Sequence, residues 1–419
     1  MTAGNRPFDY QNGELHCEGV ALGEIAERAG TPAYVYSSAR IISRYREFHR
    51  ALGKHPHRVC YSLKANANLE VLRLLARRGA AFDIVSGGEL FRVLQAGGRA
   101  SRVVFSGVGK TADEIDYALR EGIFLFNCES ESELRLLSQR ASRLKKKAPV
   151  ALRVNPHVNA PTHPHIATGL REHKFGIEMA AAERLYGEAQ SFPGLRLLGL
   201  SCHIGSQIAD LAPFEQAVKK LVSMAARLRR AGHTVQFLDA GGGLAVKYRP
   251  EDSPPSISAY GRSILSCVRG SDLKLLIEPG RALIADAAIL LTRVVHTKTT
   301  GRKNFVIVDA AMNDLIRPAL YGSYHEIRPV LRRGRRPIVA DIVGPICETG
   351  DFFARQRSLP AVEPGDLLAI FTAGAYGFVL SSNYNARPRP AEILVQGNGW
   401  RVARRRETFR DLVRGESAD

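Results

Sequence analysis

Short apolar, often β-branched runs alternate with longer segments of helical periodicity through the first two thirds of the chain. The apolar runs, which end in polar or glycine residues, are Arg58–Leu63, Ala81–Val85, Arg102–Phe105, Ile123–Phe126, Val150–Val154, Leu197–Cys202, Val235–Leu238 and Lys274–Ile277. The helical segments between them include Leu69–Arg77, Gly88–Ala96, Ala112–Arg120, Glu131–Arg140 and Pro213–Arg230. A strand followed by a helix, eight times over, predicts a (β/α)₈ TIM barrel. An open doubly wound sheet is the alternative, and the count of eight argues against it.

The pattern changes after Arg281, where little helical periodicity remains. Strand-like runs separated by glycine, proline and polar turns follow at Ala287–Thr292, Phe305–Val308, Ile338–Val343, Leu367–Phe371 and Glu392–Gln396. Such runs predict a mostly antiparallel β-sandwich or β-barrel domain. We therefore expect an N-terminal segment at 1–30 that packs with the β domain, a cofactor-binding barrel at 31–282, and a C-terminal β domain at 283–419.

Polar residues stand at the end of every predicted barrel strand. In chain order they are Lys64 and Asn66, Asp83 and Ser86, Ser106, Asn127 and Glu129, Arg153 and Asn155, His203 and Ser206, Asp239 with Gly241–Gly243, and Glu278 with Arg281. The carboxyl ends of barrel strands converge on the place where such enzymes do their chemistry. Eight polar strand ends in succession therefore predict an active site at the barrel mouth.

The net charge of +18, from 59 Lys and Arg against 41 Asp and Glu, raises the alternative of a nucleic-acid binder. The basic runs carry no interleaved aromatic residues, so we expect a solvated basic surface and no nucleic-acid partner. No apolar run reaches the roughly 20 residues of a membrane span. The first residues also lack the apolar centre of a signal peptide, and we expect a cytoplasmic protein with no membrane partner. The six scattered cysteines predict neither a metal site nor a disulfide framework.

A lysine closes the first predicted strand, in the segment Tyr61–Asn66. Directly after an apolar strand, Lys64 is expected to be partly withdrawn from water, which favours the neutral, nucleophilic amine. Such a lysine can form a Schiff base with an aldehyde cofactor. A structural lysine with its head group in water is the alternative. His203, which ends the sixth strand, can stack on a flat cofactor, although a satisfied structural histidine is the commoner case.

Two glycine-containing segments follow the last two barrel strands. The backbone N–H groups of Gly241, Gly242 and Gly243 can approach a phosphate closely, at the place where barrels commonly bind one; a tight turn is the alternative. After the eighth strand, Glu278 can keep a pyridine nitrogen protonated. Arg281 can grip a carboxylate through two parallel hydrogen bonds. An ion pair between Glu278 and Arg281 is the alternative.

The predicted β domain carries five further candidates. Arg317 and Tyr321 stand close enough in sequence to bind one carboxylate together. Cys347 places a thiol, which can donate a proton near neutral pH, beside the carboxylate of Glu348 in a glycine-flanked loop. Tyr376 lies between glycines in a loop with little side-chain competition. Each of these residues alone is more often structural than functional.

Ten motifs of the chain resemble, in the same order, those of the fold-III pyridoxal-phosphate-dependent decarboxylases. They are Tyr61–Asn66, Asp83–Glu89, Asn127–Ser130, His173–Ile177, Gly199–Gln207, Asp239–Leu244, Glu278–Arg281, Asp309–Tyr321, Gly344–Asp351 and Gly374–Phe378. The resemblance, which runs from about Thr31 to about Glu392, is closest to the members that act on meso-2,6-diaminopimelate. It implies an alanine-racemase-like barrel, pyridoxal 5′-phosphate as cofactor, and decarboxylation at the D-configured centre to L-lysine and carbon dioxide, the last step of lysine biosynthesis.

The resemblance also implies a role for each matching residue. Lys64 would be the Schiff-base lysine, with His203 stacked on the pyridine ring and Glu278 paired with the ring nitrogen. The phosphate side would be held by Ser206, Gly241, Gly242, Gly243, Glu278, Pro279, Gly280 and Arg281. The amino-acid substrate would be bound by Arg281, Arg317, Tyr321, Glu348 and Tyr376, the last of which would also touch the cofactor. Cys347 would be the catalytic proton donor. In this family Cys347 and Glu348 reach the site from a partner subunit, which implies an obligate homodimer with shared active sites.

Two positions depart from the family pattern. His173 stands where many relatives have a small polar residue, and Thr349 stands where serine is common. These departures leave open another diamino acid or a carboxylated polyamine as the substrate. Arg281 and Glu348 argue against that alternative, because an amino-acid group at the distal end of a substrate needs both a cation and an anion.

Two other classes remain as alternatives. An alanine-racemase-like enzyme would share the barrel, but the loop Cys347–Asp351 does not suit it. A non-catalytic binder that has lost its cofactor is disfavoured because Lys64 and Cys347 are both retained.

Overall fold

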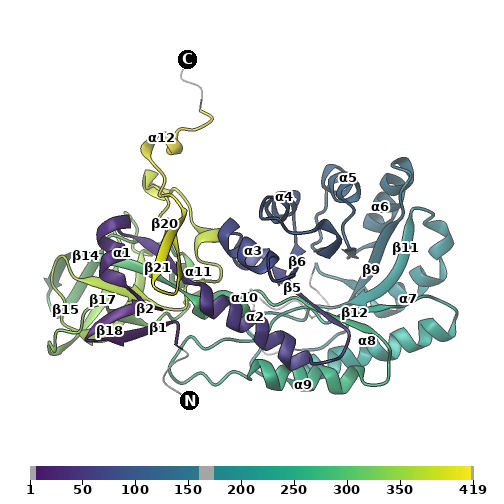
Figure 1. Cartoon of the computed structure of the whole chain (residues 1–419), viewed down its shortest axis with the longest axis horizontal. Coiled ribbons are helices and arrows are strands. Elements are labelled where there is room, and N and C mark those ends of the chain that lie inside the picture. Colours follow the sequence, from purple (N-terminus) through teal and green to yellow (C-terminus); the bar gives the residue numbers. More distant parts are fainter. Residues whose placement is uncertain (1–5, 160–173, 417–419) are drawn as a thin grey trace. The chain divides into compact units, whose positions relative to one another are not determined.

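The computed structural model describes residues 6–159 and 174–416, and these fall into two compact units (Figure 1). The sheet unit comprises the described parts of Met1–Ser43, Lys247–Asp252 and Leu283–Asp419. The barrel unit comprises the described parts of Arg44–Val246 and Ser253–Ala282. No helix in the described ranges is long and apolar enough to cross a bilayer.

The barrel unit is a closed ring of eight parallel strands. In ring order they are β5 (His57–Ser62), β6 (Ala81–Ile84), β7 (Val103–Phe105), β8 (Leu125–Cys128), β9 (Ala148–Asn155), β11 (Leu195–Ser201), β12 (Phe237–Asp239) and β13 (Lys274–Ile277). The ring closes because β13 pairs with β5. Each strand contributes one buried side chain to a common apolar cluster, which consists of Cys60, Ala81, Val104, Leu125, Ala151, Leu198, Phe237 and Leu276. The predicted (β/α)₈ barrel is confirmed.

Helices follow the barrel strands where an N-capping side chain stands at the junction. Asn68, Ser86, Thr111 and Ser130 each accept a backbone N–H at the start of the next helix. These helices are α3 (Leu69–Ala76), α4 (Gly87–Gln95), α5 (Ala112–Glu121) and α6 (Glu131–Arg143). The later helices are α7 (Met179–Gly187), which follows the two-residue strand β10 (Ile177–Glu178), α8 (Ala212–Arg230) and α9 (Ile257–Val268). The helix α2 (Ser38–Leu52) precedes β5.

The sheet unit is built on a mostly antiparallel sheet, as predicted. Its main path runs β18 (Phe352–Pro360), β17 (Pro337–Val343), β15 (Lys303–Val308), β14 (Ala288–Thr300), β4 (Ala33–Ser37), β20 (Ala391–Gln396), β21 (Gly399–Arg404). The strand β19 (Leu367–Ile370) also pairs with β14, and β16 (Ile327–Pro329) pairs with β19. Only β15–β17 and β20–β4 are parallel among these pairs. The short helices are α10 (Arg281–Ile284), α11 (Arg317–Tyr321) and α12 (Phe409–Leu412).

The N-terminal part of the chain contributes to the sheet unit. A small sheet of β1 (Phe8–Gln11), β2 (Glu14–Cys17) and β3 (Val20–Ala21) precedes α1 (Leu22–Ala29). Leu15, Leu22 and Ile25 from this region share one buried apolar cluster with Ile289 and Ile393. The segment therefore gains its stability from apolar burial against the sheet.

The strand β4 lies in the sheet unit, although the expected barrel range begins at residue 31. All five of its residues are buried, and it pairs with β14 on one side and β20 on the other. Residues Lys247–Asp252 also belong to the sheet unit. The difference arises because an apolar run shows that a strand is buried but does not show which distant strand it pairs with.

Two histidines of the barrel unit share a hydrogen bond. His49 Nδ1 lies 2.8 Å from His57 Nε2, and His57 Nδ1 lies 2.7 Å from the carbonyl oxygen of His55. Because a carbonyl can only accept, His57 Nδ1 carries a proton and His57 Nε2 accepts from His49. Burial, reinforced by repulsion from the charge of Arg102, lowers the pKa of His49 from 6.5 to about 4.

We expect the protein to lose stability as the pH falls from about 6.5 to about 4, because the unfolded chain then takes up a proton that folded His49 does not. Allowing for partial exposure, the loss attributable to His49 is about 2 kcal/mol. Denaturant unfolding at several pH values would measure it. The His49→Asn variant keeps a hydrogen-bond donor for His57 but has no group that titrates here. The stability of this variant should therefore fall less than that of the wild type as the pH is lowered. An equal fall in both proteins would contradict the assignment.

Candidate active site

Lys64 lies directly after β5 and faces an acidic neighbour. Its Nζ donates to Asp83 Oδ2 at 3.0 Å, and Ser62 Oγ donates to the same oxygen at 2.7 Å. The Asp83 side chain is fully buried, whereas the Lys64 side chain is 37% exposed. The structure thus places a buried carboxylate beside Lys64, a contact that the expectation from strand-end burial alone did not include.

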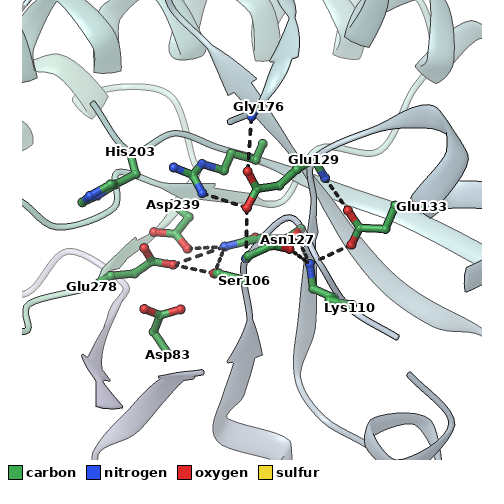
Figure 2. A network of polar contacts seen from close by, with 12 residues as sticks. Asp83, Ser106, Lys110, Asn127, Glu129, Glu133, Gly176, His203, Asp239 and Glu278 are labelled. Atoms are coloured by element: carbon green, nitrogen blue, oxygen red, sulfur yellow. Dashed lines mark hydrogen bonds and ion pairs between the residues drawn. The ribbon is translucent and has the colours of Figure 1, made fainter. Parts of the chain in front are cut away.

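Two further buried carboxyl groups, Asp239 and Glu278, are joined by the side chain of Asn127 (Figure 2). Asn127 Nδ2 lies 3.0 Å from Asp239 Oδ2 and 3.2 Å from Glu278 Oε1, and Ser106 Oγ donates to the same Glu278 oxygen at 3.3 Å. Burial, followed by repulsion from Asp239 and Asp83, raises the pKa of Glu278 well above its ordinary value. Burial also raises the pKa of Asp239. Glu278 can therefore hold a proton at neutral pH and share it with a basic nitrogen beside it.

The glycine triplet forms a close-fitting turn after β12. A Cβ on Gly242 would lie 2.2 Å from the carbonyl oxygen of Glu278. A Cβ on Gly243, where φ is +114°, would lie 2.3 Å from the carbonyl oxygen of Gly205. Only glycine fits these positions. The N–H group of Gly241 donates to Asp239 Oδ1 at 3.0 Å, and the phosphate-binding role of the triplet stays a prediction.

His203 lies against the same turn. The backbone N–H of Gly242 donates to His203 Nδ1 at 3.2 Å. Burial, followed by repulsion from Arg153 and Lys64, lowers the pKa of His203 well below 6.5. The imidazole is therefore neutral at neutral pH.

The segment after β13 is packed against the end of β5. Ser62 N donates to the carbonyl oxygen of Pro279 at 3.2 Å, and a Cβ on Gly280 would lie 3.2 Å from Ser62 Cβ. Arg281 is buried, and its Nη2 donates to Ser206 Oγ at 3.4 Å. Ser206 and Arg281, both predicted on the phosphate side, are thus brought together.

The sheet unit holds the remaining candidates. Arg317 is buried at the start of α11, where its Nη2 donates to Ser323 Oγ at 3.2 Å. Its guanidinium carbon lies 6.0 Å from the ring centre of Tyr321 and 5.1 Å from that of Tyr248. Arg317 and Tyr321 therefore lie together, as a joint carboxylate site requires. Tyr376 is half-buried with φ +55°, in the same unit.

Cys347 and Glu348 are exposed in a loop of the sheet unit. Cys347 N donates to Asn385 Oδ1 at 2.9 Å, and Tyr384 Oη donates to Glu348 Oε2 at 2.9 Å. The other five cysteines are buried, and burial raises the pKa of the Cys202 thiol to about 12. Cys347 is therefore the accessible thiol among the cysteines.

Sequence reasoning missed several side chains of these sites. Tyr248 and Tyr384 carried no motif that could have singled them out. Lys110 and Glu133 form a buried ion pair beside Asn127. The spacing Ser130-x-x-Glu133 at the start of α6 is a helix-capping pattern, and it could have drawn attention to Glu133 and thereby to its partner. Thr349 is exposed. His173 lies outside the described residues.

The barrel region, over residues 38–285, matches the family model described as pyridoxal-dependent decarboxylase, pyridoxal binding domain. The fold and its polar mouth are thus those of a decarboxylase that uses pyridoxal 5′-phosphate. A curated diaminopimelate decarboxylase from Pseudomonas aeruginosa is 54% identical over 98% of this chain and 98% of its own length.

Solved structures agree with this similarity. Diaminopimelate decarboxylase from M. jannaschii in complex with L-lysine superposes with a TM-score of 0.94 at 36% identity, covering 100% of this chain and 99% of its own. The Helicobacter pylori enzyme, also in complex with L-lysine, gives a TM-score of 0.91 at 39% identity, covering 94% of this chain and 98% of its own. The chain belongs to the diaminopimelate decarboxylase family, whose members are carboxy-lyases that use pyridoxal 5′-phosphate to convert meso-2,6-diaminopimelate to L-lysine.

Proposed function

We propose that this protein performs that decarboxylation with the residues assembled here, and that it acts as a cytoplasmic homodimer with shared active sites. The observation that carries the proposal is the barrel mouth, where Lys64, a neutral imidazole and a buried carboxyl with a raised pKa follow the carboxyl ends of β5, β11 and β13. The high identity to curated diaminopimelate decarboxylases supports the choice of substrate.

The residues present fit pyridoxal 5′-phosphate. Lys64 would hold the aldehyde carbon, His203 would lie against the ring, and Glu278 would face the ring nitrogen. Gly241–Gly243, Ser206 and the segment Glu278–Arg281 would hold the phosphate. Among the described residues, the buried Oδ1 of Asp83 has no hydrogen-bond partner, as expected of a polar atom that faces a ligand.

When bound, the cofactor supplies an electron sink for the electron pair that remains as carbon dioxide leaves. The protein residues prepare that step. Glu278 would share its proton with the ring nitrogen, which would make the ring a better electron acceptor. Asp83, which accepts a hydrogen bond from Lys64, would hold the lysine head group close to the cofactor. His203, held neutral by burial, adds no charge repulsion against the protonated ring.

The substrate would be recognised at both ends. Arg281, Arg317 and Tyr321 would bind the distal carboxylate, and Tyr376 would contact substrate and cofactor. Glu348 would bind the distal amine, which separates diaminopimelate from substrates that end in an amine or a carboxylate alone. Cys347 would return a proton to the carbon that has lost carbon dioxide.

The shared-site homodimer is proposed from the exposure of the Cys347–Glu348 loop. A proton donor must be withdrawn from bulk water during the reaction, yet both side chains are exposed in the single chain. Hydrogen bonds from Tyr384 and to Asn385 hold this loop. An exposed loop whose backbone and Glu348 side chain are held by hydrogen bonds is suited to completing the site of a partner subunit.

A substrate panel tests the function. We expect stoichiometric carbon dioxide and L-lysine from meso-2,6-diaminopimelate. We expect no release from ornithine, arginine, lysine or a carboxylated polyamine, because each lacks part of the distal amino-acid group. The LL-isomer is the matched control, since it differs from the meso-isomer only at the reacting centre and should not react. Activity on ornithine without activity on meso-diaminopimelate would overturn the substrate assignment.

A further inference from the structure

A buried lysine of the barrel unit has no role in the chemistry described so far. The Lys110 side chain is 1% exposed, and its ion-pair partner Glu133 is 7% exposed. Lys110 Nζ lies 2.7 Å from Glu133 Oε1, 2.7 Å from the carbonyl oxygen of Gly107 and 2.8 Å from that of Asn127. An ammonium has three N–H groups, so these three acceptors satisfy it completely.

The second oxygen of Glu133 extends this contact to another ion pair. Glu133 Oε2 accepts the backbone N–H of Glu129 at 2.8 Å. Glu129 Oε1 accepts from Arg153 Nη1 at 2.8 Å and from Gly107 N at 3.0 Å, and its Oε2 accepts from Gly176 N at 3.2 Å. Two buried ion pairs thus tie together the strand ends after β7, β8 and β9.

Asn127 links this network to the reacting groups (Figure 2). Its carbonyl oxygen accepts from Lys110, whereas its side-chain Nδ2 contacts Asp239 Oδ2 and Glu278 Oε1. In Figure 2 the Lys110–Glu133 pair lies on one side of Asn127 and the two carboxyl groups lie on the other. The hydrogen bond from Lys110 to the Asn127 carbonyl therefore fixes the backbone position from which the Asn127 side-chain amide contacts Glu278.

A buried ion pair is weak support for stability, because apolar residues of similar volume often replace one at no loss. Five backbone groups are nevertheless bound by this pair and by Glu129, namely the N–H and carbonyl of Gly107, the carbonyl of Asn127 and the N–H groups of Glu129 and Gly176. Fixed strand ends matter beside a reaction centre, because a small displacement of a reacting group lowers the reaction rate.

We propose that Lys110 and Glu133 are positioning residues for the decarboxylation. They fix the backbone of Asn127 and Glu129 and thereby hold the Asn127 amide between Asp239 and Glu278. The inference rests on the proposed role of Glu278 beside the cofactor nitrogen.

Lys110→Met removes the charge and all three donors with little change in volume. Glu133→Gln is the milder second variant, since its amide oxygen can still accept from Lys110 while its NH₂ faces the Glu129 N–H. Lys146→Met is the matched control, because Lys146 Nζ also donates to two backbone carbonyls, those of Leu119 and Arg120, at the end of α5. Circular dichroism establishes that each variant folds.

For both test variants, in the cofactor-loaded enzyme, we expect kcat per bound cofactor to fall roughly 10- to 100-fold with KM for meso-diaminopimelate nearly unchanged. Hydrogen exchange should quicken in the peptide that contains the Glu129 amide. The absorption maximum of the bound cofactor should shift, because Glu278 is held less firmly. Lys146→Met should match the wild type in all three measurements.

Unchanged kcat per bound cofactor, or an unshifted absorption maximum, in a folded Glu133→Gln enzyme would overturn the positioning role, even if exchange quickened. The absorption measurement needs no substrate. It therefore decides the positioning role separately from the proposed function, which fails instead if the wild type releases no carbon dioxide from meso-diaminopimelate.

Discussion

Replacing Lys64 with alanine should abolish carbon dioxide release from meso-diaminopimelate and remove the near-visible absorption band of the lysine-bound cofactor. The loss of kcat should be at least about 10³-fold, because the variant lacks the amine that is proposed to hold the aldehyde carbon. Absorption spectra and carbon dioxide assays on the same preparations measure both effects.

Lys64→Arg is the informative control for that variant. Its guanidinium can keep the ion pair with Asp83 but is not a nucleophile at neutral pH. It should therefore lose the band and the activity as completely as alanine does. A persisting band in either variant would show that a different residue holds the cofactor.

Cys347→Ala should retain the cofactor and its absorption band while kcat falls by roughly 10²- to 10⁴-fold. The reason is that the thiol acts only when a proton returns to the carbon, after the cofactor and substrate are bound. Cofactor titration and steady-state kinetics separate the two effects. Near-wild-type turnover would rule out Cys347 as the proton donor.

The proposed sharing of active sites between subunits makes a further outcome of the same variants measurable. Lys64→Ala and Cys347→Ala subunits, inactive alone, should regain about a quarter of wild-type activity when mixed and allowed to exchange. The value arises because, after exchange of equal amounts, half of all dimers are mixed and each mixed dimer carries one intact site out of two. No recovery, with exchange demonstrated independently, would mean that each site is built from one chain.

The barrel could be predicted from sequence because each of its strands is apolar and is followed by a polar residue and then by a helix. The N-caps Ser86, Thr111 and Ser130 are local signals, and the helices begin beside them. The place of β4 could not be predicted in this way, because its partners β14 and β20 lie far away in sequence.

The candidate site shows the same difference between local signals and contacts that are distant in sequence. Lys64, Glu278 and the glycine triplet could be predicted because each stands at the end of a strand. The ion pair of Lys64 with Asp83 joins two strand ends, and neither strand alone indicates it. Lys110 resembles any lysine before a helix until the carbonyl groups of Gly107 and Asn127 are seen to surround it.

The arrangement of β4 has a consequence for how the protein is made. Because β4 pairs with β14 and β20, both of its edges stay without partners on the ribosome until the whole barrel sequence has been translated. The barrel can close during that interval, since its eight strands are contiguous in the chain. A chain that ends before Ala391 would leave one edge of an apolar strand open to other molecules. The pairing of β20 with β4 therefore covers this edge only once residues 391–396 have been translated.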